Sequence, residues 1–96
     1  MNYRFLSPAL KELTKAAEYY EEQVPGLGED FLVEVDATIQ RILQFPQAWN
    51  ILKDGIRHCN LRRFPYTILY KPNQQEVIVI SVFHLKQDPG KWEDNL

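Results

Sequence analysis

The stretch "EVIVISVFH", residues 76–84, decides the fold of this 96-residue chain. From Val77 to Phe83 every residue except Ser81 is apolar. Such a run, without the polar alternation of a half-exposed strand, is typical of a strand covered on both sides. We therefore expect residues 76–84 to be central in a sheet and buried on both faces, or nearly so.

Turn signals place other strands around this one. Residues 72–75, "PNQQ", predict a turn that would make a hairpin with the strand before it. Asp54-Gly55 is a second turn signal, at the end of a connection over residues 46–55. The expected strands besides 76–84 are residues 2–6, 56–61 and 64–71.

An amphipathic helix is expected after the first strand. Ser7 followed by Pro8 predicts its start, with a side-chain cap and a proline in the first turn. Apolar residues then recur at steps of three and four, which places them on one buried face. That face would consist of Leu10, Leu13, Ala17 and Tyr20.

A second helix is expected directly after the first. "VPGLG" at 24–28 predicts a tight connection, and Pro46 predicts that the helix ends near Phe45. Its buried stripe would consist of Phe31, Val35, Ile39 and Ile42. The two helices would form a helical hairpin.

These elements predict an α+β fold with the order strand–helix–helix–strand–strand–strand. A small, mainly antiparallel sheet would carry the N-terminal helical hairpin on one face, leaving the other face free. Residues 1–96 are expected to form a single domain, as usual at this length.

The charge of the chain is small but uneven. The net charge is −2, with four cations against eight acids in residues 1–50 and seven against five in residues 51–96. Proteins that bind nucleic acid over a wide surface are usually basic. We therefore expect no direct DNA binding by this chain alone, and any anionic partner would have to meet a local patch.

The sequence also bears on compartment and cofactors. No apolar run is long enough for a membrane helix, and the N-terminus lacks a signal-peptide pattern, so we expect a cytoplasmic protein without membrane contact. A single cysteine, Cys59, fits a reducing cytosol and is interpreted as a small hydrophobe rather than a nucleophile. His58 and His84 lack metal-ligand spacing, and no phosphate-binding glycine motif is present, so we expect no cofactor.

Three polar residues could carry acid–base chemistry. Metal-free RNA cleavage needs a base, an acid and a cation for the developing phosphorane charge. His84, Lys86 and Arg62 are chemically adequate for these roles. The structural alternative is that His84 simply ends a buried strand while Lys86 and Arg62 are solvated.

A wider set of residues could bind a partner protein, since arginine and aromatic residues are enriched at interface centres. The alternative is structural here too, because strand tyrosines often line a core and a late tryptophan can hold a C-terminus in place. The candidates are Arg57, Arg62, Arg63, Tyr66, Tyr70 and Trp92.

Three sequence features together resemble a known family. They are the helical pair joined by "PGLG", the arginines of "LRRFPY" and the C-terminal "HLKQDPGKW". Over about residues 2–94 the chain resembles the RelE/ParE superfamily of type II toxin–antitoxin toxins. The resemblance implies a small sheet with a helical hairpin packed on it, and a growth-arresting toxin that a cognate antitoxin neutralises.

The resemblance leaves the cellular target open between two branches. RelE-type toxins cut mRNA on the ribosome with basic residues, whereas ParE-type toxins inhibit DNA gyrase and lack that set. Thr67 stands in the position of the RelE catalytic arginine, and Lys53 is the lone basic residue before the sheet strands. We favour the ParE-like branch, with the ribosome-dependent endonuclease and an inactive interaction module as alternatives, so enzyme activity stays open. Arg62 and Arg63 would then dock on an acidic stretch of the antitoxin or target.

Overall fold

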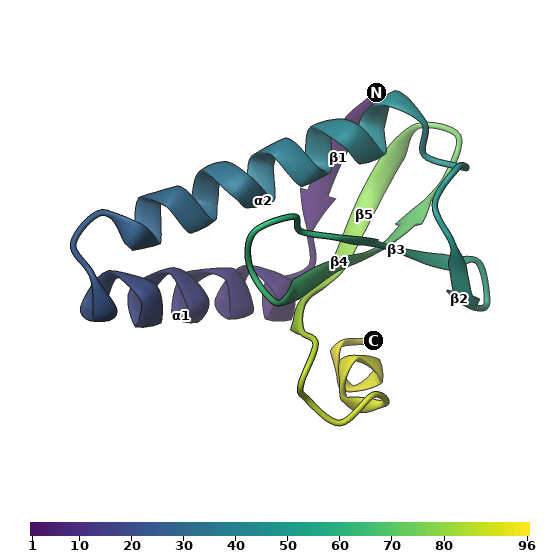
Figure 1. The fold of residues 1–96 in the computed structure, drawn as a ribbon. Helices are drawn as coiled ribbons and strands as arrows, with labels where there is room; N and C mark the ends of the chain where they lie inside the picture. Colours follow the sequence, from purple (N-terminus) through teal and green to yellow (C-terminus); the bar gives the residue numbers. More distant parts are fainter.

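The central elements of the fold are a five-stranded sheet and a pair of long helices (Figure 1). A computed structural model describes all 96 residues. The elements, in chain order, are β1 (Asn2–Phe5), α1 (Ser7–Gln23), α2 (Leu27–Gln44), β2 (Ile51–Lys53), β3 (Ile56–Asn60), β4 (Tyr66–Pro72), β5 (Glu76–His84) and the 3₁₀ helix η1 (Lys91–Asn95).

The sheet has the order β1-β5-β4-β3-β2. All its pairs are antiparallel except β1 with β5, which is parallel. The predicted α+β class, the mainly antiparallel sheet and the helical hairpin on one face are therefore confirmed. As Figure 1 shows, the loop end of the hairpin projects beyond the sheet.

β5 is buried on both faces, as predicted. Val77, Val79 and Val82 belong to the large core beneath the helices. Ile80 and Phe83 belong to a smaller core on the opposite face. The run of apolar residues is explained by this double burial, because Val77 and the residues from Val79 to Phe83 are all buried, while Ile78 stays partly exposed.

The carboxylate of Glu12 accepts hydrogen bonds at the edge of β5, beyond the point where β1 ends. β1 pairs with β5 only as far as Val79. Beyond that point Glu12 Oε1 of α1 accepts hydrogen bonds from Val82 N at 3.0 Å and Ser81 Oγ at 2.9 Å. Asn95 Nδ2 of η1 donates to the same oxygen at 3.1 Å. Glu12 thus joins α1, β5 and the C-terminal segment.

Two details predicted for the first helix are wrong. Leu6, not Ser7, is the N-cap, and no side chain caps the helix, because α1 already begins at Ser7. Leu10 is 51 % exposed rather than buried. Ala9 occupies the buried face of α1 in that turn, so the adjacent Leu10 points outward. The buried residues of α1 are Ala9, Ala16 and Ala17, with Leu13 and Tyr20 partly buried beside them.

The predicted stripe of the second helix is confirmed. Phe31, Val35, Ile39 and Ile42 are all buried. The helix ends at Gln44, and Phe45 leaves helical geometry ahead of Pro46. Gly26 begins the helix with φ 89°, a left-handed conformation that favours glycine.

β2 was not predicted, since residues 46–55 read as a connection only. In the structure Ile51 pairs with Arg57 and Lys53 with Ile56. The predicted Asp54-Gly55 turn joins β2 to β3, with φ 53° and 78° at its two residues. Three exposed residues carry too little hydrophobic pattern for such a strand to be recognised.

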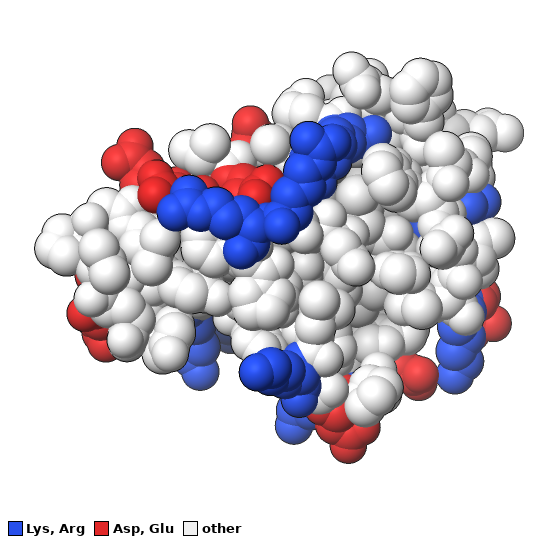
Figure 2. All heavy atoms as spheres, viewed as in Figure 1, with Lys and Arg blue, Asp and Glu red and all other residues white.

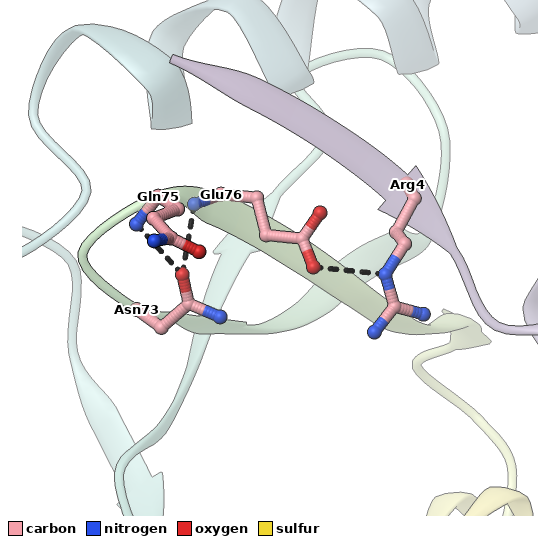
Figure 3. A network of polar contacts seen from close by, with 4 residues as sticks. All are labelled: Arg4, Asn73, Gln75 and Glu76. Atoms are coloured by element: carbon pink, nitrogen blue, oxygen red, sulfur yellow. Dashed lines mark hydrogen bonds and ion pairs between the residues drawn. The ribbon is translucent and has the colours of Figure 1, made fainter.

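β4 begins at Tyr66, two residues later than predicted, since the backbone turns at Phe64 and Pro65. The turn after β4 is as expected. Figure 3 shows Asn73 Oδ1 accepting the N–H groups of Gln75 and Glu76, both at 2.8 Å. Glu76 also pairs with Arg4 of β1 at 2.9 Å.

The face of the sheet opposite the helices is not wholly free, which corrects the expectation. Residues 91–95 form η1, and Trp92 is only 6 % exposed. It packs in the smaller core with Ile56, Leu69, Ile80 and Phe83. Trp92 thus holds the C-terminal segment against the sheet, which was the structural alternative for this residue, whereas the 3₁₀ helix around it was not predicted.

The α1–α2 turn generates the first testable prediction. A Cβ at Gly28 would lie 2.5 Å from the backbone oxygen of Ala17, so Gly28→Ala forces the helices apart. We expect a loss of about 1–3 kcal/mol in the free energy of unfolding, measured by urea denaturation. Gly90→Ala is the matched control, because a Cβ there meets nothing within 4 Å. Equal stability of the two variants would contradict this packing.

Candidate functional site

The three residues proposed for catalysis are not gathered into one site. His84 ends β5, its ring 4.8 Å from that of Tyr66, and its Nδ1 accepts the Lys86 backbone N–H at 3.0 Å. The Lys86 side chain is exposed, in the turn after β5. Arg62 lies in the β3–β4 connection. No hydrogen bond or ion pair joins the side chains of any two of the three, and none connects Arg62 with His84 or Lys86.

Arg57 serves the structure rather than an exposed binding surface. Its guanidinium donates to the carbonyl oxygens of Gln47 at 2.9 Å and Trp49 at 2.7 Å. It also donates to Gln47 Oε1 at 2.9 Å. These bonds fix the connection between α2 and β2, which would otherwise leave its carbonyl groups without partners.

Tyr70 is likewise part of the core, so its assignment as a surface binding residue is wrong. The side chain is fully buried, and its hydroxyl donates to the carbonyl oxygen of Pro46 at 2.7 Å. Burial raises the pKa of Tyr70 to about 12, although the nearby Arg57 charge opposes the shift. Tyr70 and Arg57 together hold the α2–β2 connection against the sheet.

Tyr66 and Trp92 differ in accessibility. Tyr66 is half-buried, and its ring contacts Tyr20 and Phe31 of the helical hairpin as well as His84. Burial raises the pKa of the Tyr66 phenol. Trp92 is buried, so it cannot present an open ring to a partner, and the structural alternative that it holds the C-terminus in place describes its position instead. Tyr66 keeps an exposed part for a partner.

The two adjacent arginines have different environments. Arg63 NH1 lies 3.3 Å from Asp30 Oδ2 of α2, and its backbone N–H donates to Glu34 at 3.0 Å. Its guanidinium also lies 5.3 Å from the centre of the Phe64 ring. Arg62 is exposed and forms no ion pair or hydrogen bond. Arg63 therefore holds the β3–β4 connection on α2, and Arg62 keeps its charge available.

The surface around Arg62 and Arg63 carries charges of both signs. Figure 2 shows a band of Lys and Arg over α2 and the β3–β4 connection, with acidic atoms directly beside it. Part of the band is thus neutralised within the molecule, as in the Arg63–Asp30 pair. Most of the remaining surface in this view belongs to uncharged residues.

A hollow of about 270 Å³ lies on the sheet face opposite the helices. Its apolar walls come from Leu52, Leu69, Phe83, Leu85, Pro89 and Trp92. Its polar lining residues are His58, Asn60, Thr67 and Gln87. No lysine, arginine, aspartate or glutamate lines it.

Sequence reasoning did not single out this hollow. Strand alternation does place Thr67 and Leu69 on one face of β4, and His58 and Asn60 opposite them on β3. What the sequence conceals is Gln87 and Trp92, which return to this face only through the C-terminal segment. Thr67 is 5 % exposed, and its hydroxyl has no hydrogen-bond partner. It therefore lines the hollow as a small buried side chain.

Cys59 is buried in the main core with its thiol free. Burial raises the pKa of the thiol, while the nearby Arg41 and Arg62 charges oppose the shift. A thiol kept protonated in a core is a poor nucleophile. The structure does not bring His84, Lys86 and Arg62 together as a grouped acid, base and cation. Neither helix has the length and hydropathy needed to cross a membrane.

Comparison with known proteins gives one consistent result. The family model of the ParE toxin of the type II toxin–antitoxin system parDE matches residues 3–89. Toxin ParE2 of Mycobacterium tuberculosis, in strains CDC 1551 and H37Rv, is 30 % identical over 83 residues, covering 85 % of this chain and 79 % of the relative. A chain from the chromosomal ParDE system of P. aeruginosa has a similar fold. The TM-score is 0.65 at 15 % identity, covering 90 % of this chain and 97 % of the other.

The buried phenol of Tyr70 predicts a loss of stability at alkaline pH. Above pH 10 the unfolded chain releases the Tyr70 proton, whereas the folded chain holds it until about pH 12. The unfolded state then binds fewer protons, so stability falls as pH rises through this window. Relative to Tyr70→Phe, the wild type should lose about 2–3 kcal/mol between pH 10 and 12, measured by urea denaturation. If the free energy of unfolding falls equally with pH in the wild type and in Tyr70→Phe, the raised pKa of the buried Tyr70 phenol is contradicted.

Proposed function

Because the chain belongs to the ParE toxin family of type II toxin–antitoxin systems, we infer that it arrests growth by binding DNA gyrase. A cognate antitoxin neutralises it in the cytoplasm by covering the same or an overlapping surface. The toxin acts as a protein ligand and needs no cofactor.

One observation carries this choice of target: no lysine, arginine, aspartate or glutamate lines the hollow on the open sheet face. Cleavage of RNA requires cations placed around the phosphate that accumulates negative charge. Thr67 offers a methyl and a hydroxyl group at the position where the ribosome-cutting relatives carry arginine. An uncharged, largely apolar hollow suits contact with a protein instead.

The net charge of −2 points the same way. A protein that binds ribosomal RNA gains affinity from counterion release at each phosphate that it neutralises. Thirteen acids outnumber the eleven cations of this chain, and Arg4, Lys53 and Arg63 are already paired with acids of the same molecule. Binding to gyrase requires no such excess.

Ribosome-dependent mRNA cleavage is the second candidate, and His84 favours it. Its Nδ1 is engaged by the Lys86 N–H, which leaves Nε2 free for proton transfer. The half-buried Tyr66 ring beside it could hold a base. Under this alternative, His84→Ala would abolish toxicity, whereas the gyrase function tolerates the change if the fold is kept.

Incorporation of labelled precursors after induced expression distinguishes the two targets. We expect thymidine incorporation to fall within minutes while methionine incorporation continues, because gyrase inhibition stops replication first. The uninduced culture and a strain that also expresses the antitoxin are the controls. Early loss of methionine incorporation would instead indicate that the ribosome is the target.

The environments of the two arginines yield a charge-reversal prediction. Arg62→Glu should weaken antitoxin or gyrase binding at least about tenfold, since reversal places like charges at the contact. The free energy of unfolding should change by less than about 0.5 kcal/mol, because Arg62 has no intramolecular partner. Binding is measured by calorimetry and folding by urea denaturation.

Two control variants accompany this test. Lys71→Glu makes the same charge change at an exposed residue of β4 and should leave binding intact. Arg63→Glu should instead lower stability, because it faces Asp30 and Glu34 with a like charge. If Arg62→Glu retains full affinity for both the antitoxin and gyrase, the proposal that Arg62 contacts a partner is wrong.

A further inference from the structure

A groove runs along one side of α1, between this helix and the C-terminal segment (residues 85–96). It consists of two adjoining hollows of about 660 and 190 Å³, which share Glu12 and Lys15 in their linings. Together they extend from Ser7 to Tyr19, which is about 18 Å along the helix axis at 1.5 Å per residue. The groove is therefore long enough to receive about three turns of another helix.

The helical repeat explains the shape of this groove. Residues four apart on a helix form rows, and the side chains of a second helix pack into the furrow between two rows. The outer row is exposed and forms one wall of the groove, with the members Ser7, Lys11, Lys15 and Tyr19. The next row is buried or half-buried and forms the floor, with the members Pro8, Glu12 and Ala16.

The floor and the second wall of the groove are fixed by contacts within the fold. Ala16 packs in the main core. Glu12 Oε1 accepts hydrogen bonds from β5 and from Asn95, which lines the second wall. Gln87 and Tyr66 continue this lining toward the sheet. A partner thus meets a preformed groove, which reduces the ordering cost of binding.

Lys11 and Lys15 give the outer wall a positive charge. Both are exposed, and neither forms an ion pair or a side-chain hydrogen bond within the molecule. Glu12 is the only acid in the lining, and three hydrogen bonds to its Oε1 commit it to the fold. Residues four apart on a helix have Cβ atoms about 5–6 Å from each other. Two carboxylates one helical turn apart on a partner would therefore face both lysines.

Leu10 and Tyr19 add apolar surface at the two ends of the groove. They are 51 % and 57 % exposed, and each lines one of the two hollows. Scattered exposed apolar side chains are normal on a protein surface. These two residues differ because they flank the unpaired lysines, whose methylene stems extend the apolar surface between them. The groove thus suits an occupant with apolar and acidic residues on one side.

The same features disfavour a free anion or a nucleic acid. A free phosphate would leave Leu10 and Tyr19 in water. A nucleic acid needs a longer run of cations, whereas Glu18 and Glu22 are exposed in the helical row beside the outer wall and would repel its phosphates. A polypeptide helix can match both the charge and the apolar surface.

We propose that the α1 groove binds an amphipathic helix of the cognate antitoxin, with carboxylates facing Lys11 and Lys15. Apolar residues of that helix cover Leu10 and Tyr19. The proposal rests on the proposed function only for the antitoxin, which is the partner that membership of a type II toxin–antitoxin family implies. Gln87 lines both this groove and the hollow on the open sheet face. A helix seated in the groove therefore leads the antitoxin chain to the open face.

Charge reversal tests the groove with the full-length chain and the purified antitoxin encoded beside the toxin gene. Lys11→Glu and Lys15→Glu should each weaken binding at least about tenfold, measured by calorimetry, because each places like charges at the contact. Lys71→Glu is the matched control, since it makes the same charge change at an exposed residue of β4. Urea denaturation establishes that all the variants remain folded.

Removal of an apolar contact gives a second test that leaves the charge unchanged. Tyr19→Ala should weaken antitoxin binding at least about tenfold, as expected for truncation of an aromatic interface residue. Tyr3→Ala is the control, because Tyr3 is an exposed tyrosine on β1 and lies outside the groove.

The outcomes separate this proposal from the proposed target. Losses in the three groove variants, with wild-type affinity in both controls, would support the proposal. Full affinity in the groove variants would overturn it, as would equal losses in the controls, and a loss confined to the lysine variants would overturn the seated helix. Inhibition of gyrase is measured separately, so a wild type that binds antitoxin but leaves gyrase active would refute the target alone.

Discussion

The fold depends on the burial of β5 between two cores, and the Glu12 carboxylate supplies hydrogen bonds at the edge of β5 that β1 leaves open. A strand that is apolar throughout needs cover on each side and a partner for each edge. The helical hairpin covers one face and Trp92 covers part of the other. β4 supplies one edge, but β1 reaches only Val79 on the other. Glu12 replaces the missing strand by accepting from Val82 and Ser81, and Asn95 attaches the C-terminal segment to the same oxygen.

This construction leaves little grouped polar chemistry on the surface, which is the basis of the proposal that the chain acts by binding another protein. The polar groups nearest to the sheet are already engaged in the fold: Arg57 with the α2–β2 connection, and Arg63 with α2. Two features of the remaining surface stand out: Arg62, the unpaired arginine of the β3–β4 connection, and a hollow on the open face that no lysine, arginine, aspartate or glutamate lines. A charged contact and an apolar hollow on separate elements suit binding to another protein, where charge sets specificity and apolar burial supplies affinity.

The parts of the fold that the sequence predicts are those encoded by local periodicity. The β5 run, the stripe of α2 and the Asp54-Gly55 turn are examples, because each depends on residues close together in the chain. Parts determined by distant partners escape prediction. The hydrogen bond between Asn95 and Glu12 spans 83 positions, and no local pattern near either residue predicts it.

The candidate site is also determined by distant partners. Arg62 and Arg63 look equivalent in the sequence, and only the contacts of Arg63 with Asp30 and Glu34 of α2 distinguish their environments. The hollow needs Leu52 from an unpredicted strand and Trp92 from an unpredicted helix.

The central claim, that this toxin acts by binding gyrase and does not cleave RNA, can be tested most directly with purified components. Relaxed plasmid, gyrase and ATP are incubated with increasing toxin, and supercoiling is followed on agarose gels. In parallel, mRNA on translating ribosomes is examined by primer extension at the same toxin concentrations. The account predicts that supercoiling is lost in proportion to toxin, that added antitoxin restores it, and that the mRNA stays intact. Cleavage of ribosome-bound mRNA at concentrations that leave supercoiling unaffected would contradict it.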